Sequence, residues 1–88
     1  MNFLPSARIN LSFGGLNYCY YDGIYYRPFR SGYYEVIAPP IGVRINQLPP
    51  YSEKVYINGR TYYVSEGIYY KAVQNRIGLL VYEVVGYD

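Results

Sequence analysis

The chain has 88 residues, which is enough for one small domain with a modest core and too few for a Rossmann fold or a TIM barrel. Its formal net charge of +2 is too weak to indicate a nucleic-acid surface, and its single cysteine, Cys19, excludes an internal disulfide. Histidine is absent, so the usual general acid–base residue and commonest metal ligand is missing, whereas tyrosine is unusually frequent at 15 residues.

The first half of the chain predicts four strands joined by short turns. Gly14-Gly15 and Asp22-Gly23 are typical of two-residue hairpin turns, because a type I′ turn needs positive φ at both central residues. The segments between these turns are rich in Tyr and Ile, which favour pleated strands. We expect strands over residues 8–13, 16–21, 24–29 and 33–38. Pro28 should lie near a strand end or on an edge, since it cannot donate a ladder hydrogen bond.

A proline-rich connector at residues 39–47 follows the fourth strand. Pro39-Pro40 favours an extended path, and the alternation of Ile41, Val43 and Ile45 with other residues is compatible with a short strand. The connector is too apolar to be a flexible linker. We therefore expect it to pack, and to tie the two halves of the chain into a single compact domain spanning residues 1–88.

The second half of the chain repeats the first at an offset of 44. Residues 4–29 align with residues 48–73 without a gap, and Gly23-Ile24-Tyr25-Tyr26 falls on Gly67-Ile68-Tyr69-Tyr70. A gapless match that keeps the glycines predicts two copies of one supersecondary unit. The last strand aligns at a shift of 48, because the second copy carries four extra residues in the preceding loop.

Each copy, at about residues 4–38 and 48–85, is predicted to be an antiparallel meander. In the second copy we expect strands near 53–57, 60–65, 68–73 and 79–85. A two-residue turn at Asn58-Gly59 would pair Ile57 with Arg60 and Val55 with Tyr62. Neither face of the strands is uniformly polar, as in small, strongly bent sheets. The predicted fold class is all-β, with two tandem meanders forming a small SH3-like barrel or a compact sandwich.

Five Tyr-Tyr pairs are the most distinctive motif. Adjacent strand residues point to opposite faces, so each pair should put one ring inward and one outward. The inner rings would then fill the core, and the outer rings would make cross-strand pairs. Alternatively, the outer rings form a platform for a sugar or a partner protein, and stacking on single-stranded nucleic acid is a weaker third interpretation. The candidate binding surface consists of Tyr20, Tyr25, Tyr69, Arg27 and Lys71.

No catalytic, cofactor-binding or metal-binding constellation is predicted. Asp22 and Glu66 hold equivalent positions before glycine, so turn chemistry explains them better than catalysis. Glu35 and Glu83 are likewise equivalent and are expected on exposed strand faces or edges. Cys19 has no histidine to activate it and is expected to be a small buried residue. We therefore predict a protein that is not an enzyme and uses no cofactor.

Several motifs in combination resemble a bacterial family of unknown function whose members are small, exported and tyrosine-rich. They are Tyr-Tyr-Asp-Gly-Ile-Tyr-Tyr-Arg-Pro at 20–28, Ala-Pro-Pro-Ile-Gly at 38–42, Leu-Pro at 48–49, Asn-Gly-Arg-Thr-Tyr-Tyr at 58–63 and Gly-Ile-Tyr-Tyr-Lys at 67–71. The resemblance implies a periplasmic or cell-surface location and a structural or binding role. It assigns no functional residues. The sequence itself shows no export signal and no apolar run long enough to span a bilayer.

Two function hypotheses follow from these observations. The first is a non-enzymatic β module of the bacterial envelope that binds a glycan or protein through exposed tyrosines. The second is a purely structural or assembly domain, which would associate through an exposed strand edge. The location of the exposed tyrosines distinguishes them, because rings clustered in a groove favour binding and scattered rings favour a structural role.

Overall fold

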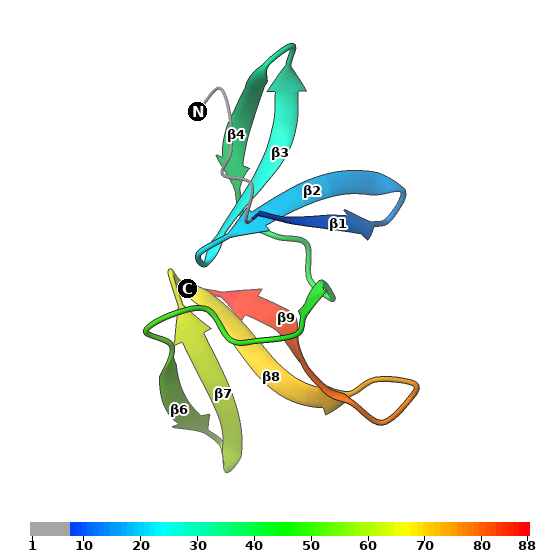
Figure 1. Cartoon of the computed structure of the whole chain (residues 1–88). Helices are drawn as coiled ribbons and strands as arrows, with labels where there is room; N and C mark the ends of the chain where they lie inside the picture. Colours follow the sequence, from blue (N-terminus) through cyan, green and yellow to red (C-terminus); the bar gives the residue numbers. More distant parts are fainter. Residues whose placement is uncertain (1–7) are drawn as a thin grey trace. The chain divides into compact units, whose positions relative to one another are not determined.

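The computed structural model describes residues 8–88, and all of their regular structure is β-strand (Figure 1). The chain divides into two compact units, Met1–Pro39 and Pro40–Asp88. Each unit contains one antiparallel sheet. The fold class is therefore all-β, as the sequence predicts.

The sheet of the first unit is a four-stranded meander. Its strands are β1 (Ile9–Phe13), β2 (Leu16–Tyr21), β3 (Ile24–Arg30) and β4 (Tyr33–Ile37). They pair in chain order, so that β1 and β4 are the two edges of the sheet. The pairing of β3 with β4 shifts register between Pro28 and Arg30. Such a bulge bends a strand and increases its twist.

The sheet of the second unit is also a meander, and a short strand from the connector is added to its last strand. The strands are β5 (Arg44–Ile45), β6 (Glu53–Ile57), β7 (Arg60–Ser65), β8 (Ile68–Gln74) and β9 (Leu80–Tyr87). Their order in the sheet is β5-β9-β8-β7-β6. The connector packs as expected, because Val43 and Ile45 are buried and Gly42 N–H donates to the Val84 carbonyl oxygen at 2.8 Å.

The predicted strands and turns are confirmed to within two residues at each end. Asn58 and Gly59 have φ values of 52° and 78°, as a type I′ turn requires, and Ile57 pairs with Arg60 across them. The strands β6, β7 and β8 begin and end 44 residues after β1, β2 and β3, respectively. The β8–β9 loop, residues 75–79, is three residues longer than the β3–β4 loop, residues 31–32, whereas the alignment predicts four extra residues there.

Neither sheet closes into the SH3-like barrel that was one of the two predicted architectures. No pairing joins the edge strands β1 and β4, or β5 and β6, among the described residues. A closed barrel has no edge strands, because strand number, tilt and register agree, whereas each of these sheets keeps two edges. The compact sandwich and the single domain spanning residues 1–88 stay predictions.

In both units the two central strands pair only beside the turn that joins them. The β2–β3 ladder runs from Tyr21↔Ile24 to Cys19↔Tyr26, and the β7–β8 ladder from Ser65↔Ile68 to Tyr63↔Tyr70. Beyond these pairs the outer hairpins diverge, as Figure 1 shows for β6–β7 and β8–β9. Each meander is thus a fork of two hairpins. Pro28 lies in such a diverging segment, where β3 pairs with β4 alone, so its missing amide hydrogen leaves no ladder bond unmade.

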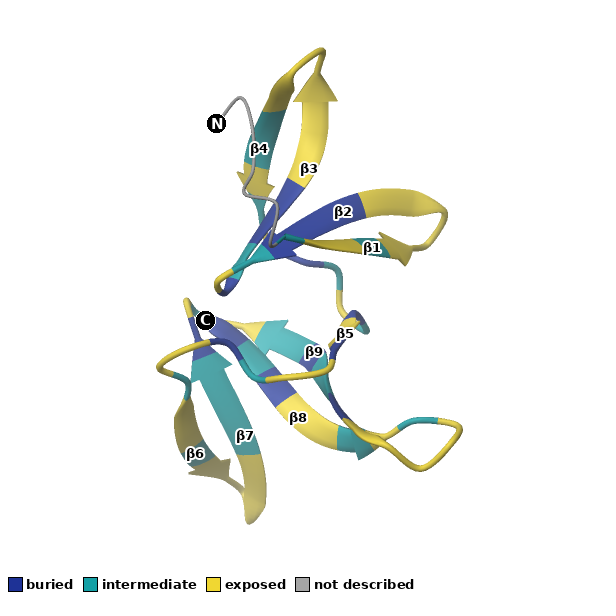
Figure 2. Ribbon diagram, in the orientation of Figure 1, coloured by how far each residue is buried: buried dark blue, intermediate teal, exposed yellow. Residues whose placement is uncertain are grey.

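The buried residues gather around these short central ladders (Figure 2). In the second unit the core is centred on Tyr70 and Val84, which are cross-strand partners and both fully buried. In the first unit Cys19 and Tyr26 pack together with Tyr21, Ile24 and Tyr34 around them. Cys19 is buried, as predicted. The tips of the hairpins are exposed, so little apolar surface holds them.

Gly59→Val should lower the free energy of unfolding by roughly 1–3 kcal/mol, because a β-branched residue is strained at positive φ. No atom lies within 4 Å of the added Cβ, so this cost comes from the backbone conformation. Gly15→Val, with a φ of 80°, should behave alike. Gly86→Val is the matched control, because Gly86 lies in a strand without positive φ and its Cβ also meets no atom within 4 Å. Urea unfolding of the three variants measures the difference, and wild-type stability in Gly59→Val would contradict the turn assignment.

The loop between β8 and β9 is ordered by one side chain. The Asn75 Oδ1 atom accepts hydrogen bonds from the amides of Ile77 and Leu79, at 3.1 and 3.0 Å. Asn75 N–H in turn donates to the Leu79 carbonyl oxygen at 2.8 Å. This arrangement holds the side chains of Ile77, Leu79 and Leu80 in solvent, and Ile77 is 79% exposed.

Asn75→Ala should destabilise the protein by about 1–2 kcal/mol, since it removes the acceptor of two backbone amides. Asn75→Asp keeps an oxygen acceptor and should retain most of the stability. Amide hydrogen exchange at residues 77 and 79 reports the same contrast locally. Equal protection of these amides in both variants would show that the Asn75 side chain does not order the loop.

Candidate functional site

The tyrosines proposed for the binding surface of the first unit are buried. Tyr20 is 7% and Tyr25 1% exposed, and their rings contact each other in a tilted arrangement, with 4.8 Å between centroids and an interplanar angle of 51°. Burial raises the pKa of the Tyr20 hydroxyl above its ordinary value of 10.0. The expectation of one inward and one outward ring is wrong for Tyr25 and Tyr26, because both are buried. Alternation does place them on opposite faces, but both faces are covered here.

Arg27, the cation proposed for the first unit, is exposed and forms an ion pair. Its Nε atom contacts Oε1 of Glu35, its cross-strand partner on β4. Glu35 therefore lies on a strand face, where it neutralises Arg27. An exposed ion pair of this kind contributes little to stability. It does neutralise the charge of Arg27, so that charge is not available to a ligand.

The remaining two candidates, Tyr69 and Lys71, lie on an open face of the second sheet. Tyr69 is partly exposed while its neighbour Tyr70 is fully buried, so this pair has the predicted arrangement. Tyr62 of β7 is also partly exposed, and by strand alternation it shares the face of Tyr69 and Lys71. The open face is thus built by alternate residues of β7 and β8.

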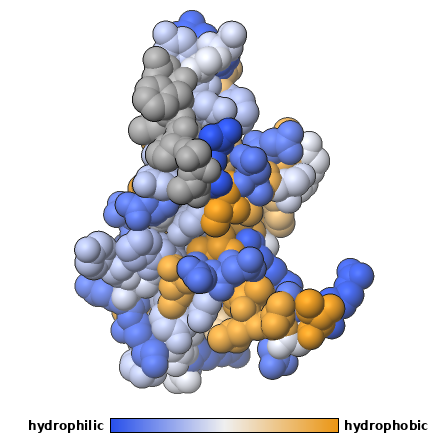
Figure 3. Space-filling model, viewed as in Figure 1, coloured by the Kyte–Doolittle hydropathy of each residue, from blue (hydrophilic) through white to orange (hydrophobic). Residues whose placement is uncertain are grey.

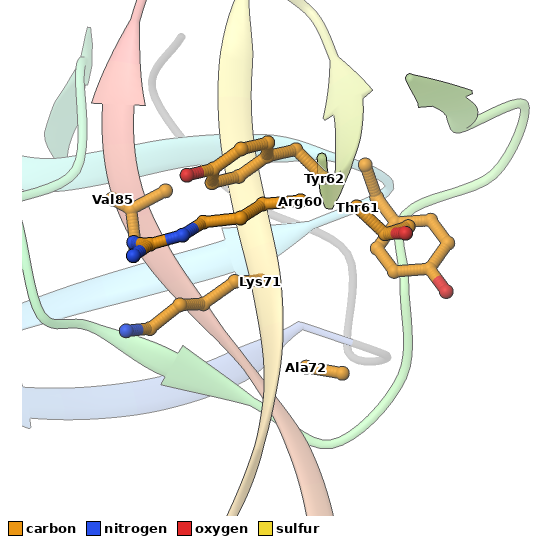
Figure 4. A pocket seen from close by; sticks show the side chains of 7 residues that line it. Arg60, Thr61, Tyr62, Lys71, Ala72 and Val85 are labelled. Atoms are coloured by element: carbon orange, nitrogen blue, oxygen red, sulfur yellow. The ribbon is translucent and has the colours of Figure 1, made fainter. Parts of the chain in front are cut away.

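Two adjoining hollows occupy this region. The first, of about 450 Å³, lies in the fork where β7 and β8 diverge and is lined by Arg60, Thr61, Tyr62, Tyr63, Lys71, Ala72 and Val85. Figure 4 shows Arg60, Tyr62 and Lys71 extending toward the side of Val85, whereas Thr61 and Ala72 point the other way. The second hollow, of about 300 Å³, is lined by Ile57, Tyr62, Tyr69, Val85, Gly86 and Tyr87. Tyr62 and Val85 line both hollows, so the two adjoin at these side chains.

The two cations of the fork have no carboxylate partner among residues 8–88. Glu83 is the cross-strand partner of Lys71, but its Oε1 accepts from Nε of Arg44 at 2.8 Å. Arg44 comes from the connector strand β5, which pairs with β9 on the side away from β8. Because the connector supplies a cation for Glu83, Arg60 and Lys71 give the fork uncompensated positive charge.

The Tyr69 hydroxyl interacts with the carboxylate of Asp88. This hydrogen bond, together with the negative charge of Asp88, raises the pKa of Tyr69 above 10.0. Asp88 is itself held by its backbone, since its N–H donates to the Gly67 carbonyl oxygen at 2.9 Å. Tyr69 also lines the second hollow.

A separate apolar surface lies on the β8–β9 loop. It consists of Ile77, Leu79 and Leu80, and Figure 3 shows its hydrophobic atoms on the projecting loop. Ile77 and Leu79 lie in the loop itself, and Leu80 is the first residue of β9. It lies on the outer arm of the second unit and lines neither hollow.

The family model for a family of unknown function, DUF6515, matches residues 1–88. The chain belongs to the DUF6515 family. This confirms the resemblance to a family of unknown function that the tyrosine and glycine motifs indicate. Neither a curated protein nor a solved structure matches this chain. Between residues 8 and 88 the DUF6515 chain forms no helix of the length and apolarity that a bilayer span requires.

The site of this DUF6515 chain offers groups that can contact a ligand. Residues 8–88 bring together no three side chains of the kinds that hold a metal ion. The fork offers two cations, phenol rings and a hydroxyl, which recognise carboxylates and planar or apolar surfaces. The site residues predicted from the sequence do not include Arg60, Tyr62 and Val85. Arg60 and Tyr62 could have been found from the sequence. They lie on the strand before that of Lys71, across the tight turn, and the predicted register places them on the same face as Lys71.

Asp88→Asn should lower the pKa of Tyr69 toward 10.0, since the amide removes the negative charge that disfavours the phenolate. NMR titration of ring-labelled tyrosines measures this shift. Tyr20 is the internal control, because burial is the main cause of its raised pKa. The wild-type contact should add stability below pH 10, and that contribution should disappear as pH rises through the pKa of folded Tyr69. An unchanged Tyr69 titration in the variant would contradict the contact.

Proposed function

We propose that this protein is a non-enzymatic binding module of the bacterial envelope that holds a glycan or a protein through tyrosines of its second unit. The observation that carries this proposal is the pair of adjoining hollows on the second sheet, which share Tyr62 and Val85 in their linings. Tyr62 and Tyr69 replace Tyr20 and Tyr25 as the proposed contact tyrosines. Lys71 stays in the proposed site, joined by Arg60.

Physical chemistry favours such a surface for recognition. A tyrosine offers a large contact area with two rotatable angles, so little conformational entropy is lost when it is immobilised. Aromatic residues and arginine are also the side chains that contribute most at protein interfaces. The hollow of about 450 Å³ lies within the size range of ligand pockets.

The proposed location is the periplasm or the cell surface. It rests on the resemblance of the tyrosine-rich motifs to exported bacterial proteins. We also propose that the two units are copies of one meander that have diverged, which is supported by the 44-residue offset of three strands. In this view the first copy became the more buried unit, and the second kept an open face.

A second candidate function is assembly, and the apolar surface of the β8–β9 loop favours it. Its three side chains, Ile77, Leu79 and Leu80, are exposed to solvent. The Asn75 hydrogen bonds nevertheless order the loop that carries them. Exposed aliphatic side chains on an ordered loop are typical of a contact with another molecule. Binding through the tyrosines and assembly through the loop would use different residues, so mutations separate them.

Tyrosine replacements test the binding role. Tyr62→Ala and Tyr69→Ala should lower affinity for a ligand identified by a glycan array or a pulldown by more than about tenfold, while costing little stability. Tyr70→Ala is the control for the core and should cost about 3–5 kcal/mol of stability, because Tyr70 is fully buried. Affinity and thermal stability are measured in parallel. If affinity merely follows stability across the three variants, the tyrosines are scaffold and the proposal fails.

A further inference from the structure

We propose that the fork between β7 and β8 receives an extended peptide segment that carries a carboxylate side chain. The fork is defined by residues 60–62 of β7 and residues 71–74 of β8, beyond the last pair of the ladder, Tyr63 and Tyr70. This inference deepens the proposed binding function, on which it rests, by choosing a peptide over a glycan.

The backbone of the fork is suited to an added strand. Along an antiparallel strand, residues whose N–H and C=O groups point toward the partner strand alternate with residues whose groups point away from it. The two residues that flank a two-residue turn form a hydrogen-bonded pair. Counted from the Ile57↔Arg60 pair, the amide and carbonyl of Thr61 point away from β6 and toward β8. Counted from Ser65↔Ile68, those of Ala72 point toward β7. Both sets of groups face the fork beyond the end of the ladder, where an extended peptide can bond to them.

The charge of the fork selects the side chain of the peptide. Arg60 and Lys71 extend to the same side of the fork, from opposite strands (Figure 4). Neither has a carboxylate partner among the described residues, because Glu83 is paired with Arg44. A peptide strand in the fork directs alternate side chains to that side, so an Asp or Glu placed there would meet both cations. Tyr62 would cover the neighbouring peptide side chain.

The equivalent fork of the first unit lacks each of these features. Pro28 stands at the position of Ala72 and has no amide hydrogen to offer. Leu16 replaces Arg60, and Arg27, the counterpart of Lys71, is paired with Glu35. Tyr18, the counterpart of Tyr62, is buried. The same backbone arrangement therefore presents a charged, bonding-competent fork only in the second unit.

The test is selection of a displayed random heptapeptide library on the folded 88-residue protein, followed by fluorescence anisotropy with the enriched peptides. We expect enriched peptides to carry Asp or Glu at one fixed position. Ala72→Pro should weaken their binding at least about tenfold, because it removes the amide hydrogen in the fork. Ala72→Val keeps that hydrogen and is the matched control. Arg60→Gln and Lys71→Gln should each weaken the binding of acidic peptides by about tenfold. The binding of the same peptides with Asn or Gln in place of the acidic residue should change little.

Peptides N-methylated at one position at a time provide a measurement that leaves the protein unchanged. Loss of binding at alternate positions supports an added strand, and equal binding of all N-methylated peptides would overturn it. Failure to enrich any acidic peptide would also overturn it. A glycan whose binding needs Tyr62 but not the Ala72 amide would overturn this inference and leave the proposed function standing. If neither a glycan nor a protein needs Tyr62 or Tyr69, the proposed function fails as well.

Discussion

The structure of each unit depends on a central ladder that is only three residue pairs long. It begins at a tight turn and ends where the two hairpins diverge, so it is the one place where four strands run side by side. Buried side chains gather there, because only there can both hairpins contribute apolar surface to the same core. The short ladder therefore explains two features together, a core close to the central turn and an open fork beyond it.

The two units use this arrangement differently because a few side chains differ at equivalent positions. Arg44 of the connector pairs with Glu83, which leaves Lys71 uncompensated, whereas Arg27 is paired with Glu35. Proline at position 28 and alanine at position 72 give the two forks different backbone chemistry. Two meanders with the same strand lengths thus present different side chains in their forks.

Much of the strand arrangement could be predicted from local chemistry. Turns such as Asn58-Gly59 set the register of their hairpins, because the loop length and the positive φ values leave one pairing. The exposure of individual tyrosines could not be predicted in this way. Tyr25 and Tyr69 occupy equivalent positions, yet one is buried and the other is partly exposed, because exposure depends on what covers the face.

The sequence by itself determined the all-β class, the strand bounds and the tight turns, since these follow from residue alternation and from the φ values that glycine and asparagine tolerate. Tertiary structure decided where the central ladders end, which cation meets Glu83, and that the sheets stay open. These features depend on contacts between residues far apart in the chain, as between Arg44 and Glu83. Local pattern contains no information on such contacts, so the sequence could place Lys71 on a strand face but could not show that its charge stays uncompensated.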